Sequence, residues 1–194
     1  MIIGAHNAWS YLPVSKWWMK PLRFTAKCQR CSIKEQYEKH NVRCFDLRIR
    51  FDKHDVPVIC HGLIEYKYSY EDLLEDLKWL QSKGDAIVRL LLELRSVNKD
   101  DWSKQKKLFN TFYNTILKIF YPNIEFIRGR SLPDWDKIIK TVSEPDETED
   151  YASVCAPKYI DDWIPILYAE LNNKKSREKY KECNILLLDF VDIY

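Results

Sequence analysis

The sequence predicts an α/β fold on a parallel sheet, in the form of a compact, irregular or incomplete TIM-type (β/α) barrel. Short apolar runs alternate along the chain with longer segments of helical periodicity, a pattern typical of strands joined by crossover helices. The runs at residues 90–92 and 186–188 are apolar without a break, which indicates strands covered on both faces. A full barrel usually takes about 250 residues, whereas this chain has 194. We therefore expect a single domain over residues 1–194 and a barrel below full size.

Seven runs are candidate strands because they are rich in apolar or β-branched residues. Side chains alternate in the second run, so that Asp46 and Arg48 share one face. The third run contains Pro57, which a strand tolerates best near its start. The seven runs are residues 2–5, 42–49, 56–60, 86–94, 124–127, 152–155 and 185–190.

Four segments of helical periodicity lie between these runs. The first begins with a capping-box pattern at Ser32 and Glu35. The second begins at Ser69 and stops near Gly84, and the third stops before Pro122, which cannot continue a helix. The four segments are residues 32–41, 69–84, 102–120 and 162–182.

Charge and hydropathy exclude several classes of protein. The 31 basic and 29 acidic residues leave a net charge of +2, without the basic excess expected of a nucleic-acid binder. The sequence has no apolar run of about 18 residues, as a membrane-spanning helix would need. Its N-terminus lacks the basic start and apolar region of a signal peptide. We expect a cytoplasmic protein, or a secreted one whose leader has been removed; the sequence does not indicate an oligomeric state.

The six cysteines indicate ordinary thiols. Cys28 and Cys31 form a C-x-x-C motif, but no second motif or histidine pair follows to complete a zinc site. Zinc binding there is the less favoured interpretation, since free cysteine usually behaves as a small buried apolar residue. A disulfide framework is not expected in a domain of this size.

Two histidines stand where an apolar run gives way to a loop. His6 follows the first run and His61 follows the third. In a parallel barrel, functional side chains gather at the carboxyl ends of the strands. A single histidine in such a place is more often structural, but two in equivalent places indicate an acid–base pair. One imidazole can act as a base and the other as an acid near neutral pH.

Between the histidines, Asp46 and Arg48 lie two residues apart within an apolar strand. Charges buried there need partners, so a self-compensating ion pair is one interpretation. The alternative is a site in which Arg48 neutralises a phosphate while Asp46 orients a histidine. Guanidinium suits phosphate because it binds bidentately and keeps its charge.

Four pieces of the chain carry a family resemblance: His6-Asn7 and the segments 32–36, 42–48 and 58–62. In this order and spacing they resemble the X-type catalytic region of the phosphatidylinositol-specific phospholipase C family. The clear resemblance covers about residues 2–95. It implies a phospholipase C-like phosphodiesterase barrel acting on phosphatidylinositol or a related phospholipid or inositol phosphate. Further along, residues 186–191 resemble the last strand of the family, whose aspartate, here Asp189, partners the first histidine.

The resemblance also implies a mechanism. His6, helped by Asp189, would take the proton from the inositol 2-hydroxyl, whose oxygen attacks phosphorus. His61, helped by Asp46, would protonate the leaving diacylglycerol oxygen. A cyclic inositol phosphate would form, and water would then open it.

Arg48 bears on whether the reaction uses a metal. Calcium-dependent members of the family have an acidic residue at this place, whereas the metal-independent bacterial type has arginine. Arg48 therefore implies the bacterial type and no cofactor. Asn7 and Glu93 coincide with calcium-binding positions of the other type, so a calcium ion held by Asn7, Asp46 and Glu93 stays open as the less favoured alternative. A neighbouring arginine would oppose such an ion.

The remaining substrate contacts are less well defined by the sequence. Asn7, Glu93, Arg95 and Tyr159 are the residues expected to bind substrate. Tyr159 is what remains here of the Asp-x-Tyr of the bacterial pocket. The base of that pocket could instead come from Arg89, Arg128 or Arg130.

The segment after His6 suggests contact with a membrane surface. It contains Trp17 and Trp18 with lysines on either side, a combination suited to the interface between water and lipid. We expect these tryptophans either to touch lipid or to pack against the rim of the barrel.

Two alternatives to a phospholipase C-like enzyme remain. Glycerophosphodiester phosphodiesterases use a similar barrel, but they expect acidic metal ligands spaced Glu-x-Asp, which Asp46-x-Arg48 does not provide. The other alternative is a catalytically weak or inactive module that binds phospholipid or inositol phosphate. The weaker match of the second half of the chain supports it, and fold alone does not decide between a binder and an enzyme.

Overall fold

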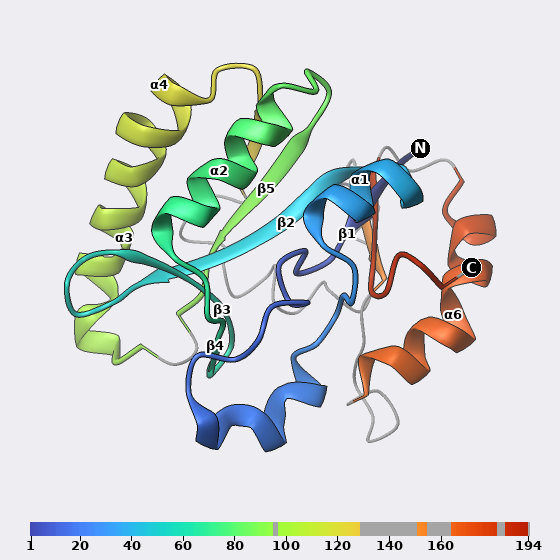
Figure 1. Ribbon diagram of the computed structural model, residues 1–194, viewed down its shortest axis with the longest axis horizontal. Coiled ribbons are helices and arrows are strands. Elements are labelled where there is room, and N and C mark those ends of the chain that lie inside the picture. The colour runs from blue at the N-terminus through green and yellow to red at the C-terminus, as the bar shows by residue number, and fades with distance from the viewer. Residues whose placement is uncertain (95–96, 129–150, 155–163, 182–184, 194) are drawn as a thin grey trace.

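The computed structural model describes residues 1–94, 97–128, 151–154, 164–181 and 185–193. Strands and helices alternate as predicted, and α1, α3 and α6 pack against strands of the sheet, whereas η1 lies beside β4 (Figure 1). The strands are β1 (Ile2–Ala5), β2 (Val42–Phe51), β3 (Pro57–His61), β4 (Ile64–Glu65), β5 (Ile87–Leu92), β6 (Glu125–Arg128), β7 (Tyr151–Val154) and β8 (Ile185–Leu188). The helices are η1 (Trp17–Thr25), α1 (Ile33–His40), α2 (Tyr70–Gln81), η2 (Lys99–Asp101), α3 (Trp102–Thr111), η3 (Phe112–Leu117), α4 (Lys118–Phe120) and α6 (Pro165–Lys179).

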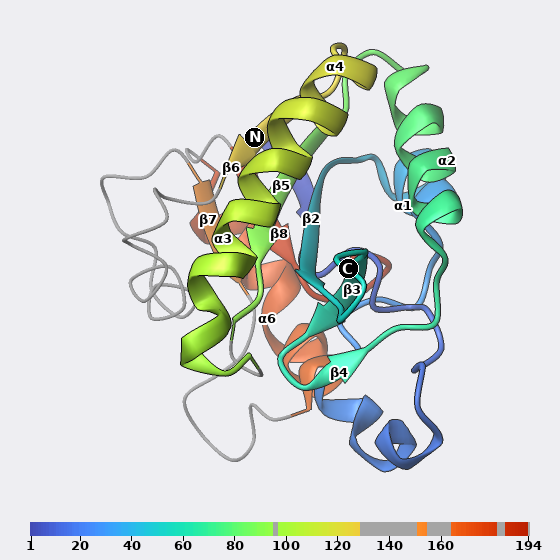
Figure 2. The ribbon, with the colours of Figure 1, turned by 90° about the vertical axis from the view of Figure 1, so that its left-hand side faces the viewer.

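Six strands form a continuous parallel sheet in the order β6-β5-β2-β1-β8-β7. Figure 2 shows this sheet edge-on, with α3 along β5 and α6 near β8. In the part of the chain that the structure describes, no strand joins β6 to β7, so the sheet curves like a barrel without closing. The predicted incomplete TIM-type barrel is therefore confirmed.

One strand runs against the prediction. The wholly parallel sheet expected from the sequence is wrong for β3, which pairs antiparallel with β2. β2 continues to Phe51, turns back through a bend in which Asp55 has a φ of 62°, and pairs Phe51 with Pro57. The chain between these strands is too short for a crossover helix, so only a hairpin is available. The return brings His61 back toward the middle of β2.

Local capping places the helices as predicted. Ser32 Oγ accepts a hydrogen bond from the Glu35 N–H, and the Glu35 carboxylate accepts one from the Ser32 N–H, which begins α1. Ser69 and Asp72 repeat this capping box at α2. The predicted helix at 102–120 is continuous, with a wider π-helical stretch at η3. Of the last predicted helix, α6 begins at Pro165, and residues 162–163 lie outside the described ranges.

The interior face of the sheet changes from apolar to polar along the strands. Near the amino ends, Cys44, Ile87, Ile185 and Leu187 form a small buried cluster. Two residues further along three of these strands stand Asp46, Arg89 and Asp189, all of them buried. The same alternation therefore builds an apolar floor at one level and a charged site directly above it.

No helix within the described residues is long and apolar enough to cross a membrane.

Candidate active site

His6 stands at the carboxyl end of β1, beside the end of β8. Ala5 is paired with Leu188, and the His6 N–H donates to the Leu188 carbonyl at 2.9 Å. Because parallel neighbours end together, the residues that follow, His6 and Asp189, meet side by side. His6 Nδ1 lies 2.7 Å from Asp189 Oδ1, and both side chains are buried. The structure thus brings together the pair that the family resemblance implied.

The other ring nitrogen of His6 faces Arg48. His6 Nε2 lies 2.5 Å from Arg48 Nη2. A guanidinium can only donate, so Nε2 accepts and the imidazole proton resides on Nδ1, from which it is donated to Asp189. The hydrogen-bond network therefore defines one tautomer, with the Nε2 lone pair directed into the site.

Asp46 is the fully buried centre of this charged cluster. Its Oδ2 accepts hydrogen bonds from Arg48 Nε and from the Asn7 N–H, both at 3.0 Å. Its Oδ1 lies 3.4 Å from Arg89 Nη1 on β5, the strand position with which Asp46 is paired. Burial alone would raise the pKa of Asp46, but the two guanidiniums outweigh it and hold that pKa well below its usual range. Asp46 and Arg48 thus form an ion pair on one strand face, a contact that is compatible with both interpretations of the sequence.

His61 lies across the site from His6. The two imidazole rings are 5.9 Å apart between centroids and nearly perpendicular, at 85°. His61 is only partly buried, so its ring lies at the boundary between the charged cluster and solvent. Asp46 Oδ2 is 3.8 Å from His6 Nε2, whereas the prediction assigned Asp46 to His61.

The turn after His61 is held by two buried charged side chains. The Gly62 N–H donates to Glu93 Oε2 at 3.2 Å, and Arg50 Nη1 donates to the Gly62 carbonyl at 2.9 Å. Glu93 directly follows β5 and Arg50 belongs to β2, so neighbouring strands supply the two contacts. Arg50 was not singled out by the sequence, and the alternation that places Asp46, Arg48 and Arg50 on one face was the available signal.

The predicted metal ligands do not fit a divalent ion. Asn7 offers one buried oxygen, Oδ1, that accepts no hydrogen bond from the described residues. Both oxygens of Asp46, however, face arginine guanidiniums, and Glu93 Oε2 receives the Gly62 N–H. Calcium requires six to eight oxygen ligands, and the two guanidiniums would repel it.

A second group of possible metal ligands includes Cys28. Its thiol, a His6 nitrogen and an Asp189 oxygen lie within 4.8 Å of one another. The guanidinium of Arg48 borders the same imidazole and again opposes a cation. Cys31 does not complete a C-x-x-C site with these groups, since its sulfur lies 3.8 Å from His40 Nε2.

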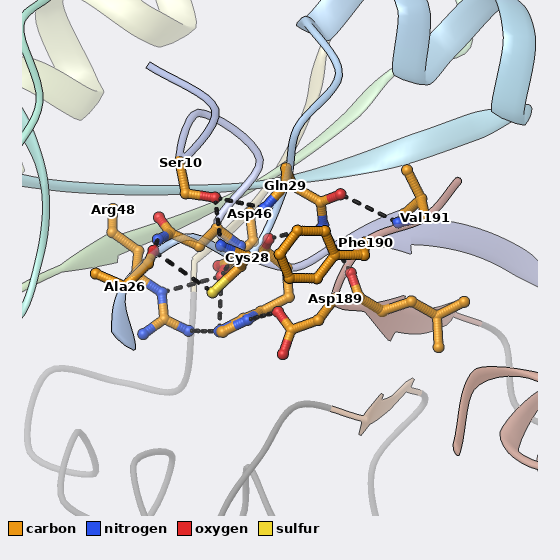
Figure 3. A network of polar contacts seen from close by, with 12 residues as sticks. Ser10, Ala26, Cys28, Gln29, Asp46, Arg48, Asp189, Phe190 and Val191 are labelled. Carbon is orange, nitrogen blue, oxygen red and sulfur yellow. Dashed lines mark hydrogen bonds and ion pairs between the residues drawn. The ribbon is translucent and has the colours of Figure 1, made fainter. Parts of the chain in front are cut away.

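A loop that contains Gln29, which the sequence analysis did not identify, holds the backbone of His6 in place. Gln29 Nε2 donates to the carbonyls of His6 and Leu188, at 3.1 and 2.8 Å, and Gln29 Oε1 accepts from the Val191 N–H (Figure 3). Ser10 Oγ accepts from the backbone of Cys28 and Gln29. No local pattern marks these residues, because their partners lie on strand ends far away in the sequence.

The remaining predicted residues fall into two groups. Arg95 and Tyr159, expected to bind substrate, lie outside the described residues. Trp17 and Trp18, at the start of η1, are 79% and 53% exposed, so Trp17 does not pack against the rim, whereas about half of Trp18 is covered. Further exposed apolar side chains on η1 and the β3–β4 turn are Leu22, Phe24 and Leu63, which the sequence did not single out.

Solved structures with a similar fold are known. No family model matches the chain, and no curated protein matches it. The phosphatidylinositol-specific phospholipase C of Listeria monocytogenes is similar with a TM-score of 0.59 and 20% identity, over 97% of this chain and 87% of that one. The phosphatidylinositol-specific phospholipase C of Staphylococcus aureus is similar with a TM-score of 0.63 and 14% identity, over 97% and 85% of the two chains.

At these identities the likeness establishes the fold. The chain has the TIM-type barrel fold of these structures, incomplete in its described strands. The two structures to which it is similar are both bacterial phosphatidylinositol-specific phospholipases C.

Proposed function

We propose that this protein is a phosphoric diester hydrolase or lyase that cleaves phosphatidylinositol or a related phospholipid head group. The observation that carries the proposal is the pair of facing histidines, 5.9 Å apart, with Asp189 on one nitrogen of His6 and Arg48 on the other. A base, an acid and a phosphate-binding cation are the groups that such a cleavage needs.

His6 is proposed as the general base. Asp189 holds the proton on Nδ1, which leaves Nε2 to take a proton from the inositol 2-hydroxyl. Arg48 donates to Nε2 in this structure, and a phosphate oxygen would be the stronger acceptor for the guanidinium. Substrate binding would thereby release Nε2 for its proton as the hydroxyl oxygen attacks phosphorus.

His61 is proposed as the general acid. It would donate a proton to the leaving diacylglycerol oxygen as a cyclic inositol phosphate forms, and the two histidines would exchange roles when water opens the ring. The pairing of Asp46 with His61 stays a prediction. The described contacts of Asp46 support a different contribution, in which it holds Arg48 in place for the phosphate.

The proposed reaction uses no metal. Arg48 and Arg89 bring positive charge to the cluster where the phosphate would lie, and both are buried. Fixed guanidiniums in a site of low dielectric can stabilise the charge that develops on phosphate oxygens.

We also propose that the exposed rim formed by Trp17, Trp18, Leu22, Phe24 and Leu63 touches the lipid surface. Leu63 is in the turn that follows His61, and η1 packs beside β4. The apolar rim and the proposed acid are thus neighbours, which suits a substrate whose head group stands at the edge of a membrane.

The test is hydrolysis of phosphatidylinositol, with and without EDTA, by the wild type and by the His6→Ala and His61→Ala variants. Each variant is expected to lose about 10²- to 10⁴-fold in kcat, and EDTA is expected to change nothing. His40→Ala and His54→Ala replace the two other histidines of the chain and serve as matched controls.

Each contrary outcome identifies an alternative. Loss of activity in EDTA would overturn the metal-free proposal. Turnover of glycerophosphodiesters alone would favour a glycerophosphodiester phosphodiesterase. Binding of inositol phosphate without turnover of any phosphodiester would identify an inactive binding module.

A further inference from the structure

Two charged side chains of the barrel, Arg50 and Glu93, form hydrogen bonds with the backbone of Gly62. Its N–H donates to Glu93 Oε2 at 3.2 Å, and its carbonyl accepts from Arg50 Nη1 at 2.9 Å. Arg50 is 9% exposed and Glu93 is 6% exposed. Arg50 Nη2 also donates to Glu65 Oε1 at 2.6 Å, across the same hairpin. We call Arg50 and Glu93 the Gly62 clamp.

The tip of this hairpin extends beyond the ladder that joins β3 to β2. That ladder pairs residues 57–59 of β3 with β2, whereas Cys60 and His61 pair with Glu65 and Ile64 of β4. The Tyr66 N–H also donates to the Ile59 carbonyl at 3.0 Å. Figure 2 shows β3 and β4 projecting beyond the parallel strands. His61 is the last residue of β3, so any movement of the tip moves its imidazole directly.

Gly62 is required for its backbone conformation and not for lack of space. Its φ is +57°, whereas a Cβ built there would meet no atom within 4 Å. Side chains other than asparagine and aspartate rarely adopt this conformation. Arg50 and Glu93 therefore bind a peptide group whose orientation depends on having glycine at position 62.

The packing of the barrel does not explain why two charges are buried here. Burying a carboxylate and a guanidinium is costly, and apolar residues of similar volume often serve stability as well or better. Hydrogen bonds between a charged side chain and the backbone, by contrast, are stronger than those between neutral groups. The burial of Arg50 and Glu93 is explained if the site requires a fixed position of the Gly62 peptide.

We propose that Arg50 and Glu93 are positioning residues that place the His61 imidazole through the Gly62 peptide. The inference rests on the proposed function, in which His61 protonates the leaving oxygen. An acid must come within hydrogen-bond reach of that oxygen, and a misplacement of about 1 Å can reduce a rate by about 10²-fold. In this proposal Glu93 positions His61 through its hydrogen bond to the Gly62 N–H, and it does not ligate a metal.

The kinetic test compares two leaving groups. Glu93→Ala and Arg50→Ala are assayed on an inositol phosphodiester with an alkyl leaving group and on its p-nitrophenyl analogue, which leaves without protonation. On the alkyl substrate kcat is expected to fall by about 10- to 100-fold, with KM little changed. On the analogue the fall is expected to stay below about fivefold, because no general acid is needed.

Two variants control this comparison. Glu93→Gln keeps an oxygen that can accept the Gly62 N–H, and it should retain most of the activity on the alkyl substrate. Arg43→Ala removes another arginine of β2, one that pairs with Asp85 at the opposite end of the strand, and it should behave like the wild type. Equal losses on both substrates, or a Glu93→Gln variant as impaired as Glu93→Ala, would overturn the proposal.

A second readout needs no turnover. The imidazole resonances of the resting protein are recorded by NMR and assigned with His61→Ala. Glu93→Ala should shift or broaden the His61 signals while those of His40 and His54 stay in place. Unchanged His61 signals would contradict the clamp even if the enzyme is active. If the wild type cleaves no phosphodiester, the proposed function fails, and the NMR result still decides the positioning role.

Discussion

At the scale of single residues, Asp46 is the side chain around which the site is arranged. It is fully buried and accepts hydrogen bonds from the first residue after His6, from its own strand and from β5. Asp46 holds the guanidiniums of Arg48 and Arg89 in one buried cluster. Two fixed guanidiniums are suited to an anionic ligand such as a phosphate diester.

Replacing Asp46 with asparagine should be costly to stability. In Asp46→Asn the buried guanidiniums of Arg48 and Arg89 lose the charge of this carboxylate, so we expect the free energy of unfolding at pH 7 to fall by about 3–5 kcal/mol. Urea denaturation measures this change. Asp85→Asn, at a half-exposed partner of Arg43, is the matched control and should change stability by less than about 1 kcal/mol.

The pH dependence of that difference has a defined sign. The folded-state pKa of Asp46 is lowered, so its contribution is fully present above the unfolded-state pKa of about 3.9. Below that pH Asp46 binds a proton in the unfolded chain, whereas in the folded protein it stays ionised. The gap between wild type and Asp46→Asn should therefore be constant from pH 8 to 5, on the order of its pH 7 value, and shrink below about pH 4. A gap that instead widens in acid would contradict the ion-pair assignment.

At the scale of elements, β1 decides where His6 lies. This short strand is flanked by β2 and β8 on its two sides, and its Gly4 faces the apolar floor of the barrel. A Cβ on Gly4 would lie 2.4 Å from Leu187 Cδ2 and 3.2 Å from Cys44 Cβ. The glycine therefore lets the neighbouring strands approach closely beneath the site.

Filling that space should loosen the sheet. We expect Gly4→Ala to reduce the free energy of unfolding by about 1–3 kcal/mol, because Leu187 is fully buried and has little room to turn away. Urea unfolding checks the value. Gly84→Asn, at a positive-φ glycine with open space around it, serves as the control. If Gly4→Ala lowers the free energy of unfolding as much in a Leu187→Ala background as in the wild type, the steric explanation is wrong.

At the scale of the whole molecule, the proposed site and the exposed rim lie at one end. In Figure 1, η1 and the β3–β4 hairpin are at the bottom, whereas α4 is at the top. Two further exposed apolar side chains, Ile119 and Phe120, are on α4. Exposed apolar side chains of the described residues thus occur at both ends, and those of η1 and the β3–β4 turn are the ones near the proposed site.

This arrangement predicts which end binds lipid. The double variant Trp17→Ala with Trp18→Ala should bind phosphatidylinositol-containing vesicles at least about tenfold more weakly, since burying each large apolar side chain contributes about 1.5–3 kcal/mol. Cosedimentation measures the binding. Ile119→Ala with Phe120→Ala removes a comparable exposed pair at the other end and should bind like the wild type. Unchanged vesicle binding by the tryptophan variant would refute contact at the rim.

Much of the site could be predicted from local pattern. Alternation along β2 was enough to put Asp46 and Arg48 on one face, because side chains of a strand alternate whatever the strand is paired with. The apolar runs that end at His6 and Asp189 likewise indicated strand ends, and the parallel pairing of β1 with β8 brings them together. The reversed direction of β3 could not be inferred this way, since an apolar run does not reveal which way its neighbour runs.

The sequence by itself therefore determined the barrel class, the facing histidines and the charged pair between them. Only the tertiary structure decided that Arg48 lies on His6 Nε2, that Gln29 ties the ends of β1 and β8, and that Arg50 and Glu93 grip Gly62. The physical reason is the range of the interactions. Periodicity and capping depend on neighbours a few residues away, whereas these contacts depend on the register and direction of strands far apart in the chain.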